Sequence, residues 1–173
     1  MRNQISMAAH ELLQNEHQPT SGQFSTFFVA DLFFGVDVLC VQEVLRSQQM
    51  TRVPRAPRVI EGLINLRGQI VTAIDMRRRL GLPPRAGDMT PMNMVVRTED
   101  GAVSLLVDEI GDVLDVEQAT WERAPESLDP AAREIIRGVY KLKERLLLVL
   151  DAERTVDFLA GSSASATPGM SLI

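Results

Sequence analysis

Residues 62–80, GLINLRGQIVTAIDMRRRL, carry the most informative structural pattern of this chain. Apolar residues lie on both sides of a polar break at 65–68, which is typical of two short strands joined by a tight turn. Asp75 then stands where the N-cap of a helix would stand, MRRRL follows as a short helix, and Gly81 with Pro83 would end it. The stretch therefore predicts strand, turn, strand and helix in immediate succession.

A second copy of this pattern begins 76 residues further along, in GVYKLKERLLLVLDAERTV at 138–156. Four residues are identical in the two copies, and Arg67 corresponds to Lys143. The identical pairs are Gly62 and Gly138, Leu66 and Leu142, Asp75 and Asp151, and Arg78 and Arg154. A weaker echo relates VQEVL at 41–45 to IGDVL at 110–114. The repeat predicts a mainly β protein of two related, five-stranded small β-barrels with short helices, because a small closed sheet fills its interior with its own side chains.

Apolar alternation and turn residues predict the elements outside the repeat. They are a hairpin with strands at 24–29 and 34–39 and a turn near Asp31, a strand or helical turn at 41–46, a proline-bearing connector at 52–59, a hairpin at 92–110, a helix from the N-cap Asp129 to Gly138, and a strand at 145–151. Residues 1–22 are expected to form a flexible arm, and the small, polar residues 160–173 a disordered tail. The folded part is therefore expected over 23–159, as two intertwined barrels.

The charges are unevenly distributed, although the net charge is only −5. Residues 46–85 carry nine arginines and two carboxylates, a net of +7, whereas residues 98–130 carry ten carboxylates and Arg123, a net of −9. Such asymmetry concerns partners more than the fold. A small nucleic-acid-binding barrel is the alternative that the basic segment suggests. The acidic segment would repel phosphate, however, and 77–79 is a run of arginines without aromatic residues for base stacking, so we interpret it as the outer face of a short helix.

The sequence shows no pattern for catalysis, a metal or a cofactor. His10 and His17 both fall in the expected arm, which supplies no rigid partners for a catalytic or metal site. Asp108, Glu109 and Asp112 are interpreted as a solvated turn, since a metal loop needs a denser set of oxygen ligands. We therefore expect a non-enzymatic protein.

Cys40 is the only cysteine, and its apolar surroundings predict a buried structural thiol. No run approaches the roughly 20 apolar residues of a membrane helix, and the N-terminal residues lack the apolar core of a signal peptide. The expected location is therefore the cytoplasm, without insertion into a membrane.

Arg67 is the residue of the opening stretch that the fold does not explain. It is either an ordinary exposed arginine beside the turn residues Asn65 and Gly68, or it is held by a carboxylate and presented at a surface. A guanidinium suits the second role because its planar fork binds a carboxylate with two hydrogen bonds and keeps other donors free. Glu43 and Glu61 are both candidate partners, and periodicity does not choose between them.

Four segments, in this order, carry a resemblance to a known family. They are FFGVDVLCVQEVLR at 33–46, TRVPRAPRVIEGLINLRGQIVTAIDMRRRLG at 51–81, LLVDEIGDVLDV at 105–116 and GVYKLKERLLLVLD at 138–151. Together they resemble the CheW family of bacterial chemotaxis adaptors over residues 23–159, and the P-x-x-P-x-x-I-x-G-L-x-N-L-R-G segment is highly specific. The resemblance implies two packed five-stranded β-barrels and no enzymatic activity.

The resemblance also implies partners. Members of the family couple transmembrane chemoreceptors to the histidine kinase CheA, in rings where adaptor and kinase domains alternate. This chain would accordingly bind the cytoplasmic tip of a chemoreceptor and the regulatory domain of CheA, and it would be recruited to membrane-associated receptor clusters. No kinase or receiver domain is attached, so it resembles the stand-alone adaptor. Nucleic acid is not expected as a partner.

The family's receptor-binding groove lies between the barrels, and its positions correspond to Val41, Glu43, Gly62, Arg67 and Val113. In the family the glutamate pairs with the arginine, which implies a Glu43–Arg67 salt bridge that clamps the edge of the groove. Such a pair would contribute a few kcal/mol if it is desolvated and under about 1 kcal/mol if it is exposed.

A kinase contact of the second barrel corresponds to residues near 121–128, with Trp121, Glu122, Ser127 and Leu128 as candidates. The sequence departs from the family here, because Glu122 and Ser127 occupy positions that are basic and aromatic in well-known relatives. A basic first barrel and an acidic second barrel would suit a ring, in which one face meets a different face.

Overall fold

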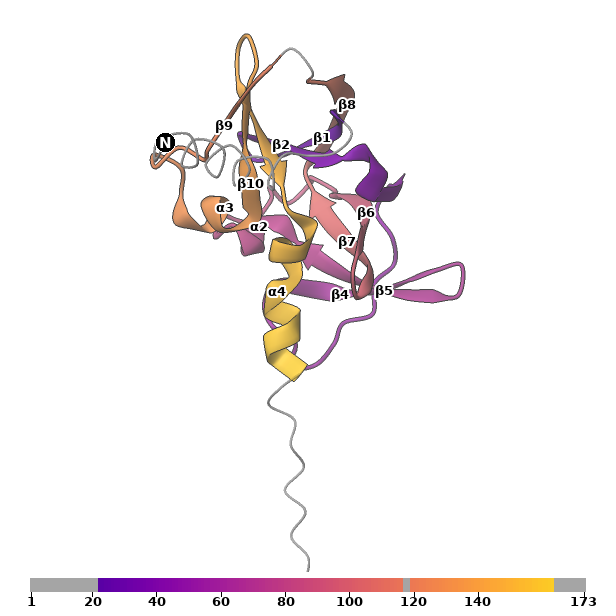
Figure 1. The fold of residues 1–173 in the computed structure, drawn as a ribbon. Coiled ribbons are helices and arrows are strands. Elements are labelled where there is room, and N and C mark those ends of the chain that lie inside the picture. The colour runs from indigo at the N-terminus through magenta and orange to yellow at the C-terminus, as the bar shows by residue number, and fades with distance from the viewer. Residues whose placement is uncertain (1–21, 117–118, 164–173) are drawn as a thin grey trace, which may run out of the picture.

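The structure is a computed structural model that describes residues 22–116 and 119–163. Two β-sheets make up most of it, and short helices lie beside them (Figure 1). The six-stranded sheet has the order β8-β1-β2-β11-β10-β9, and the five-stranded sheet has the order β3-β6-β7-β5-β4. This confirms the mainly β fold of two small units that the repeat predicts.

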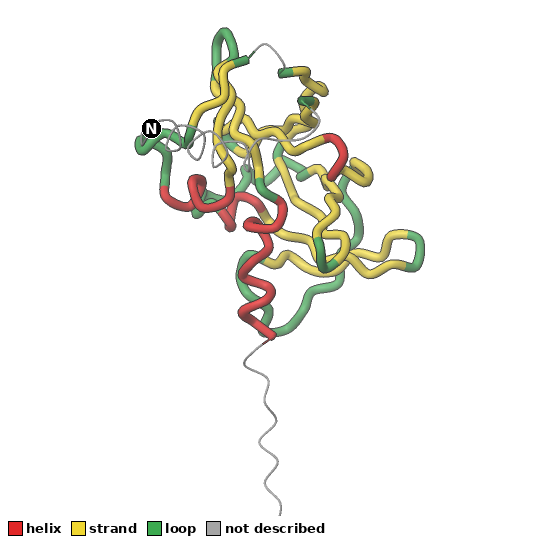
Figure 2. The backbone as a smooth tube through the Cα atoms, viewed as in Figure 1, coloured by secondary structure: helices red, strands yellow, loops and turns green. Residues whose placement is uncertain are grey.

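The elements follow the chain as β1 (Gln23–Val29), β2 (Leu32–Asp37), η1 (Val38–Cys40), β3 (Val41–Leu45), β4 (Ile60–Leu66), β5 (Gln69–Asp75), α2 (Met76–Arg79), β6 (Met92–Thr98), β7 (Gly101–Val107), β8 (Glu109–Asp115), β9 (Thr120–Glu122), α3 (Pro130–Ile135), β10 (Ile136–Lys141), β11 (Leu146–Leu150) and α4 (Ala152–Ser163). Figure 2 shows that long loops, in green, separate some of these strands, among them the connector between β3 and β4. Within the described part of the chain, no helix is both long and apolar enough to cross a membrane.

The two sheets repeat one strand order. With the shift of 76 residues, β4 and β5 correspond to β10 and β11, and the echo in the sequence relates β3 to β8. Each set encloses a hairpin, β6–β7 in one sheet and β1–β2 in the other, and this hairpin pairs in parallel with β5 or with β11. The N-terminal hairpin therefore completes the sheet of the C-terminal half, and the two units are intertwined along the chain.

Neither sheet is closed by hydrogen bonds between its first and last strands. Each sheet does have an additional pairing at its outer edge. In the connector, Thr51 exchanges two backbone hydrogen bonds with Leu63 of β4, at 2.9 and 2.8 Å. At the equivalent place in the other sheet, Glu122 of β9 pairs with Val139 of β10. The strand β9 is thus the counterpart of the connector around Thr51, extended from one bridge to a short strand.

The main hydrophobic core joins the two sheets. Phe27 and Phe34 of the six-stranded sheet stack at 5.4 Å between ring centroids, and they are buried in one cluster with Leu105 of β7. Leu147 belongs to a second, smaller cluster, whereas its neighbour Leu148 belongs to the main one. Because successive strand residues point to opposite faces, both faces of the six-stranded sheet are covered near β11.

The helix expected over 129–138 is shorter than predicted. It begins as expected, with Asp129 as N-cap, but it ends at Ile135, and β10 begins at the next residue. A Cβ at Gly138 would lie 2.6 Å from the ring of Trp121. This glycine therefore permits the close approach of β9 to β10 and does not end a helix.

Two further boundaries differ. The strand expected at 34–39 ends at Asp37, and the next three residues form the 3-10 turn η1. After β11, α4 runs to Ser163, beyond the expected boundary at 159. The expected arm, with both histidines, lies outside the described residues except for Gly22, and so does the tail beyond 163.

Candidate functional site

The β4–β5 hairpin carries Arg67 at its tip and projects from the body of the structure (Figure 1). Its two-residue turn has left-handed backbone at both positions, with φ of 51° at Arg67 and 87° at Gly68. The side-chain oxygen of Asn65 accepts a hydrogen bond from the Gly68 N–H at 2.8 Å. This is the turn geometry that matches the twist of a hairpin, so it fixes where the Arg67 side chain leaves the backbone.

Arg67 reaches from the hairpin tip to Glu43 on β3. Nη2 lies 3.0 Å from Oε2, and Nη1 lies 3.4 Å from Oε1, which is a two-bond arrangement. β3 and β4 are the two ends of the five-stranded sheet order, so the pair bridges the two edges of that sheet. Of the two partners that periodicity left open, Glu43 pairs with Arg67, while Glu61 pairs with Arg78 at 2.7 Å.

The Glu43–Arg67 pair is open to solvent on the arginine side. The Arg67 side chain is 81% exposed, whereas that of Glu43 is 15% exposed. A guanidinium in water keeps most of its hydration, so the pair contributes under about 1 kcal/mol to the free energy of unfolding. It orients a positive, solvent-facing group and does little to hold the sheet together.

Gly62 is buried beneath the connector and is not part of an open surface. A Cβ at this position would lie 2.7 Å from the Thr51 carbonyl oxygen and 3.3 Å from the Met50 Cβ. Only glycine leaves room for the backbone bridge between Thr51 and Leu63. Gly62 therefore acts on the surface indirectly, by allowing the connector to lie against β4.

The two valines of the predicted groove lie on different sheets. Val41 begins β3, is half-buried and packs against the main core. Val113 lies on the edge strand β8, where it pairs with Ser25 of β1, and it is 57% exposed. The structure thus brings Glu43 and Arg67 into contact, and it places Val41 on the same strand as Glu43 and Val113 on the other sheet.

A buried ion cluster that the sequence did not reveal links three segments. Asp108, at the β7–β8 junction, lies 2.7 Å from Arg77 Nη2 and 2.7 Å from Arg85 Nε. Arg85 also lies 3.0 Å from Asp75, and none of the four side chains is more than 13% exposed. The Ala30 N–H, from the β1–β2 turn, donates to Asp108 at 2.7 Å. The expectation of a solvated turn is therefore wrong for Asp108.

The cluster sets the protonation of Asp108. Burial alone raises the pKa of this carboxyl group, but the hydrogen bonds from Arg77 and from the Ala30 N–H, together with the charge of Arg85, outweigh it, and the pKa lies below its ordinary value of 3.8. The hydrogen bond to Asp108 in turn raises the pKa of Arg77. Asp108 is therefore ionised at neutral pH and holds two buried arginines.

The arginine run at 77–79 is not an outer face. The side chains of Arg77 and Arg79 are 13% and 11% exposed, and only Arg78, at 48%, faces solvent. Arg79 donates to the backbone carbonyls of Thr155 and Arg154 on α4. The predicted exposure is wrong for Arg77 and Arg79, and part of the charge asymmetry is neutralised inside the protein.

Cys40 is half-buried, less than predicted, and desolvation raises the pKa of its thiol. A raised pKa disfavours the reactive thiolate. Within residues 22–116 and 119–163, no group of three or more His, Cys, Asp and Glu side chains is placed to hold a metal ion.

Comparison with known proteins assigns this fold to a family. The model of the CheW-like domain matches residues 23–159. The chain belongs to the CheW family. The chemotaxis protein CheW of Bacillus subtilis (strain 168) is 33% identical over 149 residues, which are 86% of this chain and 94% of that protein. The chemotaxis protein CheW of Klebsiella aerogenes is 34% identical over 136 residues, which are 78% of this chain and 82% of that protein.

A solved CheW structure has the same fold. The scaffolding protein TtCheW from Thermoanaerobacter tengcongensis superposes with a TM-score of 0.66 and 26% sequence identity, covering 75% of this chain and 88% of that chain. The resemblance to the CheW family is therefore confirmed, and with it the place of this chain in a family of chemotaxis scaffolds.

The CheW resemblance proposed four residues for a kinase contact, and the structure divides them into two kinds. Trp121 packs on Tyr140, with 4.8 Å between ring centroids, and Leu128 packs against the main core. Glu122 forms a 2.7 Å ion pair with a lysine of β10 and stays 41% exposed, and Ser127 is exposed. Only Glu122 and Ser127 are therefore free of a packing role, and these are the two positions that depart from the family pattern.

Proposed function

We propose that this chain is a non-enzymatic adaptor that couples chemoreceptors to the histidine kinase CheA in signalling arrays. The CheW-like match over 23–159 is the observation that supports this most. Arg67 is exposed at the tip of a hairpin that projects from the body and is oriented by Glu43 of β3, which supports a binding surface at this place. In this role the protein holds a receptor tip and a kinase domain in a fixed relation.

The receptor tip would dock as a helix on the surface that carries Val41, Glu43, Arg67 and Val113, with Gly62 supporting it from beneath. Recognition of a helix in a groove needs apolar anchors and a few polar groups that fix the register. Three large apolar side chains are exposed on β8, on η1 and at the start of β5: Val113 (57%), Leu39 (67%) and Ile70 (61%). Arg67, oriented by Glu43, would supply the polar group, because its exposed face keeps free N–H donors.

The kinase domain would contact a separate surface near 121–128, where Glu122 and Ser127 face solvent. Adaptor and kinase domains would then alternate in a ring at the membrane-associated receptor cluster. A ring needs heterologous contacts, and unlike charges on the two faces favour the correct pairing. If charge contributes in this way, these contacts should weaken as the salt concentration rises.

The experiment is a pull-down of the wild-type chain and of the Arg67→Ala and Glu43→Ala variants. The baits are the cytoplasmic tip of the cognate chemoreceptor and, separately, the regulatory domain of CheA. Lys143→Ala is the matched control, since Lys143 is the counterpart of Arg67 in the repeat and is exposed. Thermal melts establish that each variant is folded.

We expect Arg67→Ala and Glu43→Ala to lose receptor binding while they retain kinase binding and the fold, and Lys143→Ala to retain both partners. Early melting of both groove variants would show a structural pair and would sink the assignment of the receptor surface. A wild-type chain that binds neither bait would contradict the adaptor function itself.

A further inference from the structure

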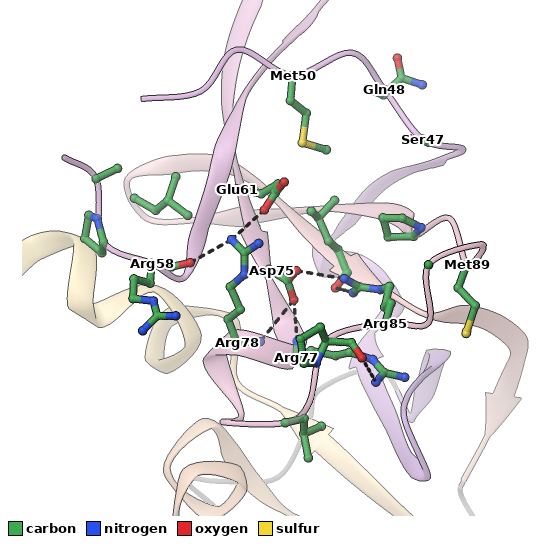
Figure 3. Close-up of a pocket in the computed structure, with 18 of the residues that line it drawn as sticks. Ser47, Gln48, Met50, Arg58, Glu61, Asp75, Arg77, Arg78, Arg85 and Met89 are labelled. Atoms are coloured by element: carbon green, nitrogen blue, oxygen red, sulfur yellow. Dashed lines mark hydrogen bonds and ion pairs between the residues drawn. The ribbon is translucent and has the colours of Figure 1, made fainter. Parts of the chain in front are cut away.

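A pocket of about 860 Å³ lies between the connector 46–59 and the loop 81–91 (Figure 3). Its size is typical of a ligand-binding site. None of the residues proposed above for the receptor or the kinase contact is among those that line it. The pocket is therefore a separate feature from the adaptor surfaces.

Both walls of the pocket are fixed by hydrogen bonds within the protein. On one wall Arg78 donates to the Arg58 carbonyl at 3.1 Å and pairs with Glu61 at 2.7 Å, which ties the connector to β4. On the other, Arg85 donates to the Leu106 carbonyl at 2.9 Å. A ligand would meet a preformed site and would lose little affinity to ordering it.

The pocket is positive in a protein whose net charge is negative. Four arginines and two carboxylates line it. Three of these arginines are paired with Asp108, Glu61 or Asp75, whereas Arg58 forms no ion pair with any described residue and supplies the free positive charge. The connector carries three more exposed arginines that form no ion pair in the described part of the chain: Arg46, Arg52 and Arg55. Four uncompensated cations on one segment attract an anionic partner.

The pocket also offers apolar contacts. Met50 points into it from the connector, and Met89, 46% exposed, lines its rim on the loop 81–91 (Figure 3). Methionine adapts its shape to varied side chains, which suits a peptide. No Phe, Tyr or Trp lines the pocket, so it lacks the stacking platform on which single-stranded nucleic acids bind.

We propose that this pocket binds an acidic, extended segment of a partner protein that places an apolar side chain between Met50 and Met89. The carboxylates of the segment would lie along the connector and pair with Arg52, Arg55 and Arg58. This docking site would act independently of the receptor groove, so a receptor and an acidic segment would be bound at the same time.

The test is fluorescence polarisation with the full chain and a fluorescein-labelled peptide of sequence EELEEMEE. A KKLKKMKK peptide and a labelled single-stranded oligo(dT) serve as competing probes. We expect the acidic peptide to bind, with an affinity that falls as salt rises, and neither competing probe to bind in this pocket.

Two variants locate the site. The charge-reversed Arg52→Glu/Arg58→Glu protein should bind the acidic peptide about tenfold or more weakly. Lys143→Glu/Arg123→Glu is the matched control, because it removes two exposed cations elsewhere and changes the net charge by the same amount. Met89→Ser alters only the apolar contact and should lower the affinity as well, and it remains informative if the double reversal unfolds.

Equal losses in the two charge-reversed proteins would overturn the proposal, because binding would then follow net charge and not the pocket. Binding of Met89→Ser with unchanged affinity would overturn the apolar anchor. Oligo(dT) binding that is lost in Arg52→Glu/Arg58→Glu would assign the pocket to nucleic acid instead. None of these results depends on the receptor groove, so the adaptor function is tested separately.

Discussion

The β4–β5–α2 unit and the β10–β11–α4 unit are alike at the joint between strand and helix. In both, an aspartate at the junction accepts hydrogen bonds from backbone N–H groups in the first turn of the helix: Asp75 from Arg77 and Arg78, and Asp151 from Arg154. The backbone N–H of each aspartate also donates a 2.8 Å hydrogen bond to a carbonyl upstream, Val59 for Asp75 and Ile135 for Asp151. These two acceptors are themselves equivalent in the repeat. The joint has kept its geometry in both copies because it closes the hairpin onto its helix.

The same units differ at the hairpin tip and around the aspartate. Arg67 sits in a two-residue turn and contacts Glu43, whereas Lys143 is exposed in a longer turn. Asp75 lies in a cluster whose other members are almost fully buried, while the arginines that pair with Asp151 are 37% and 42% exposed. The joint is therefore structural in both copies, and only in the first copy is its aspartate part of a buried ion cluster that links distant segments.

Removal of Asp108 should have the largest effect on the free energy of unfolding, because it disrupts the buried ion cluster that only the first unit has. Asp108→Asn leaves Arg77 and Arg85 buried with less opposing charge, and we expect a loss of about 3 kcal/mol in the free energy of unfolding. Asp151→Asn should cost about 1 kcal/mol, because its arginines reach water. Urea unfolding measures both, with the exposed Asp112→Asn as control. Equal costs for Asp108→Asn and Asp112→Asn would show that burial of the cluster does not matter.

The wild type and Asp108→Asn should also differ in how their stability depends on pH. Since the pKa of Asp108 is lowered in the folded state, its stabilisation is complete above the unfolded pKa near 3.8 and is lost as the pH falls through the folded pKa. The gap in stability between wild type and Asp108→Asn should therefore be constant at neutral pH and should narrow below about pH 4. Urea midpoints across this range test it, and a gap that widens in acid would refute the assignment.

Alanine at the two equivalent glycines should have similar, smaller effects. A Cβ at Gly62 meets the Thr51 carbonyl and one at Gly138 meets the Glu122 carbonyl, both at 2.7 Å, so each substitution should cost about 1–3 kcal/mol. Gly138→Ala should also change the fluorescence of Trp121, the only tryptophan. Gly87→Ala, in open space, is the control. If Gly62→Ala were neutral, the connector would not need to lie against β4.

The Glu43–Arg67 pair should have the smallest effect on stability. A double-mutant cycle of Glu43→Ala and Arg67→Ala is expected to give a coupling free energy under about 1 kcal/mol, because the guanidinium is exposed. Lys143→Ala should not change stability measurably. Chemical unfolding measures the coupling. A value of several kcal/mol would mean that the pair is structural and that Arg67 contributes much more to stability than the likewise exposed Lys143.

Local patterns in the sequence predicted much of the fold. The tight turn at 65–68 and the N-caps at Asp75 and Asp129 each depend on residues close together in the chain, and the structure contains all of them. The repeat was visible because its two copies keep the same local pattern 76 residues apart. In the structure the repeat extends beyond its four identities, since the pairing of Thr51 with Leu63 recurs between β9 and β10.

Long-range contacts account for what the sequence did not predict. Asp108 looked like part of a solvated turn because its partners, Arg77 and Arg85, are distant in the chain and only the fold brings them together. The excess of arginine in one segment and of carboxylate in another was the one available signal. The end of α4 was missed because its residues are small and polar, and Arg79 contacts this helix from outside the segment.

The parallel pairing of β2 with β11 has a consequence for synthesis on the ribosome. The five-stranded sheet is contiguous in the chain from β3 to β7, so it can assemble before β8 to β11 have been made. The hairpin β1–β2 is made first but must wait for β11, the last of the described strands, before its sheet is complete. Such distant pairing is slow to form, so the nascent chain holds an unfinished sheet edge until β11 has emerged.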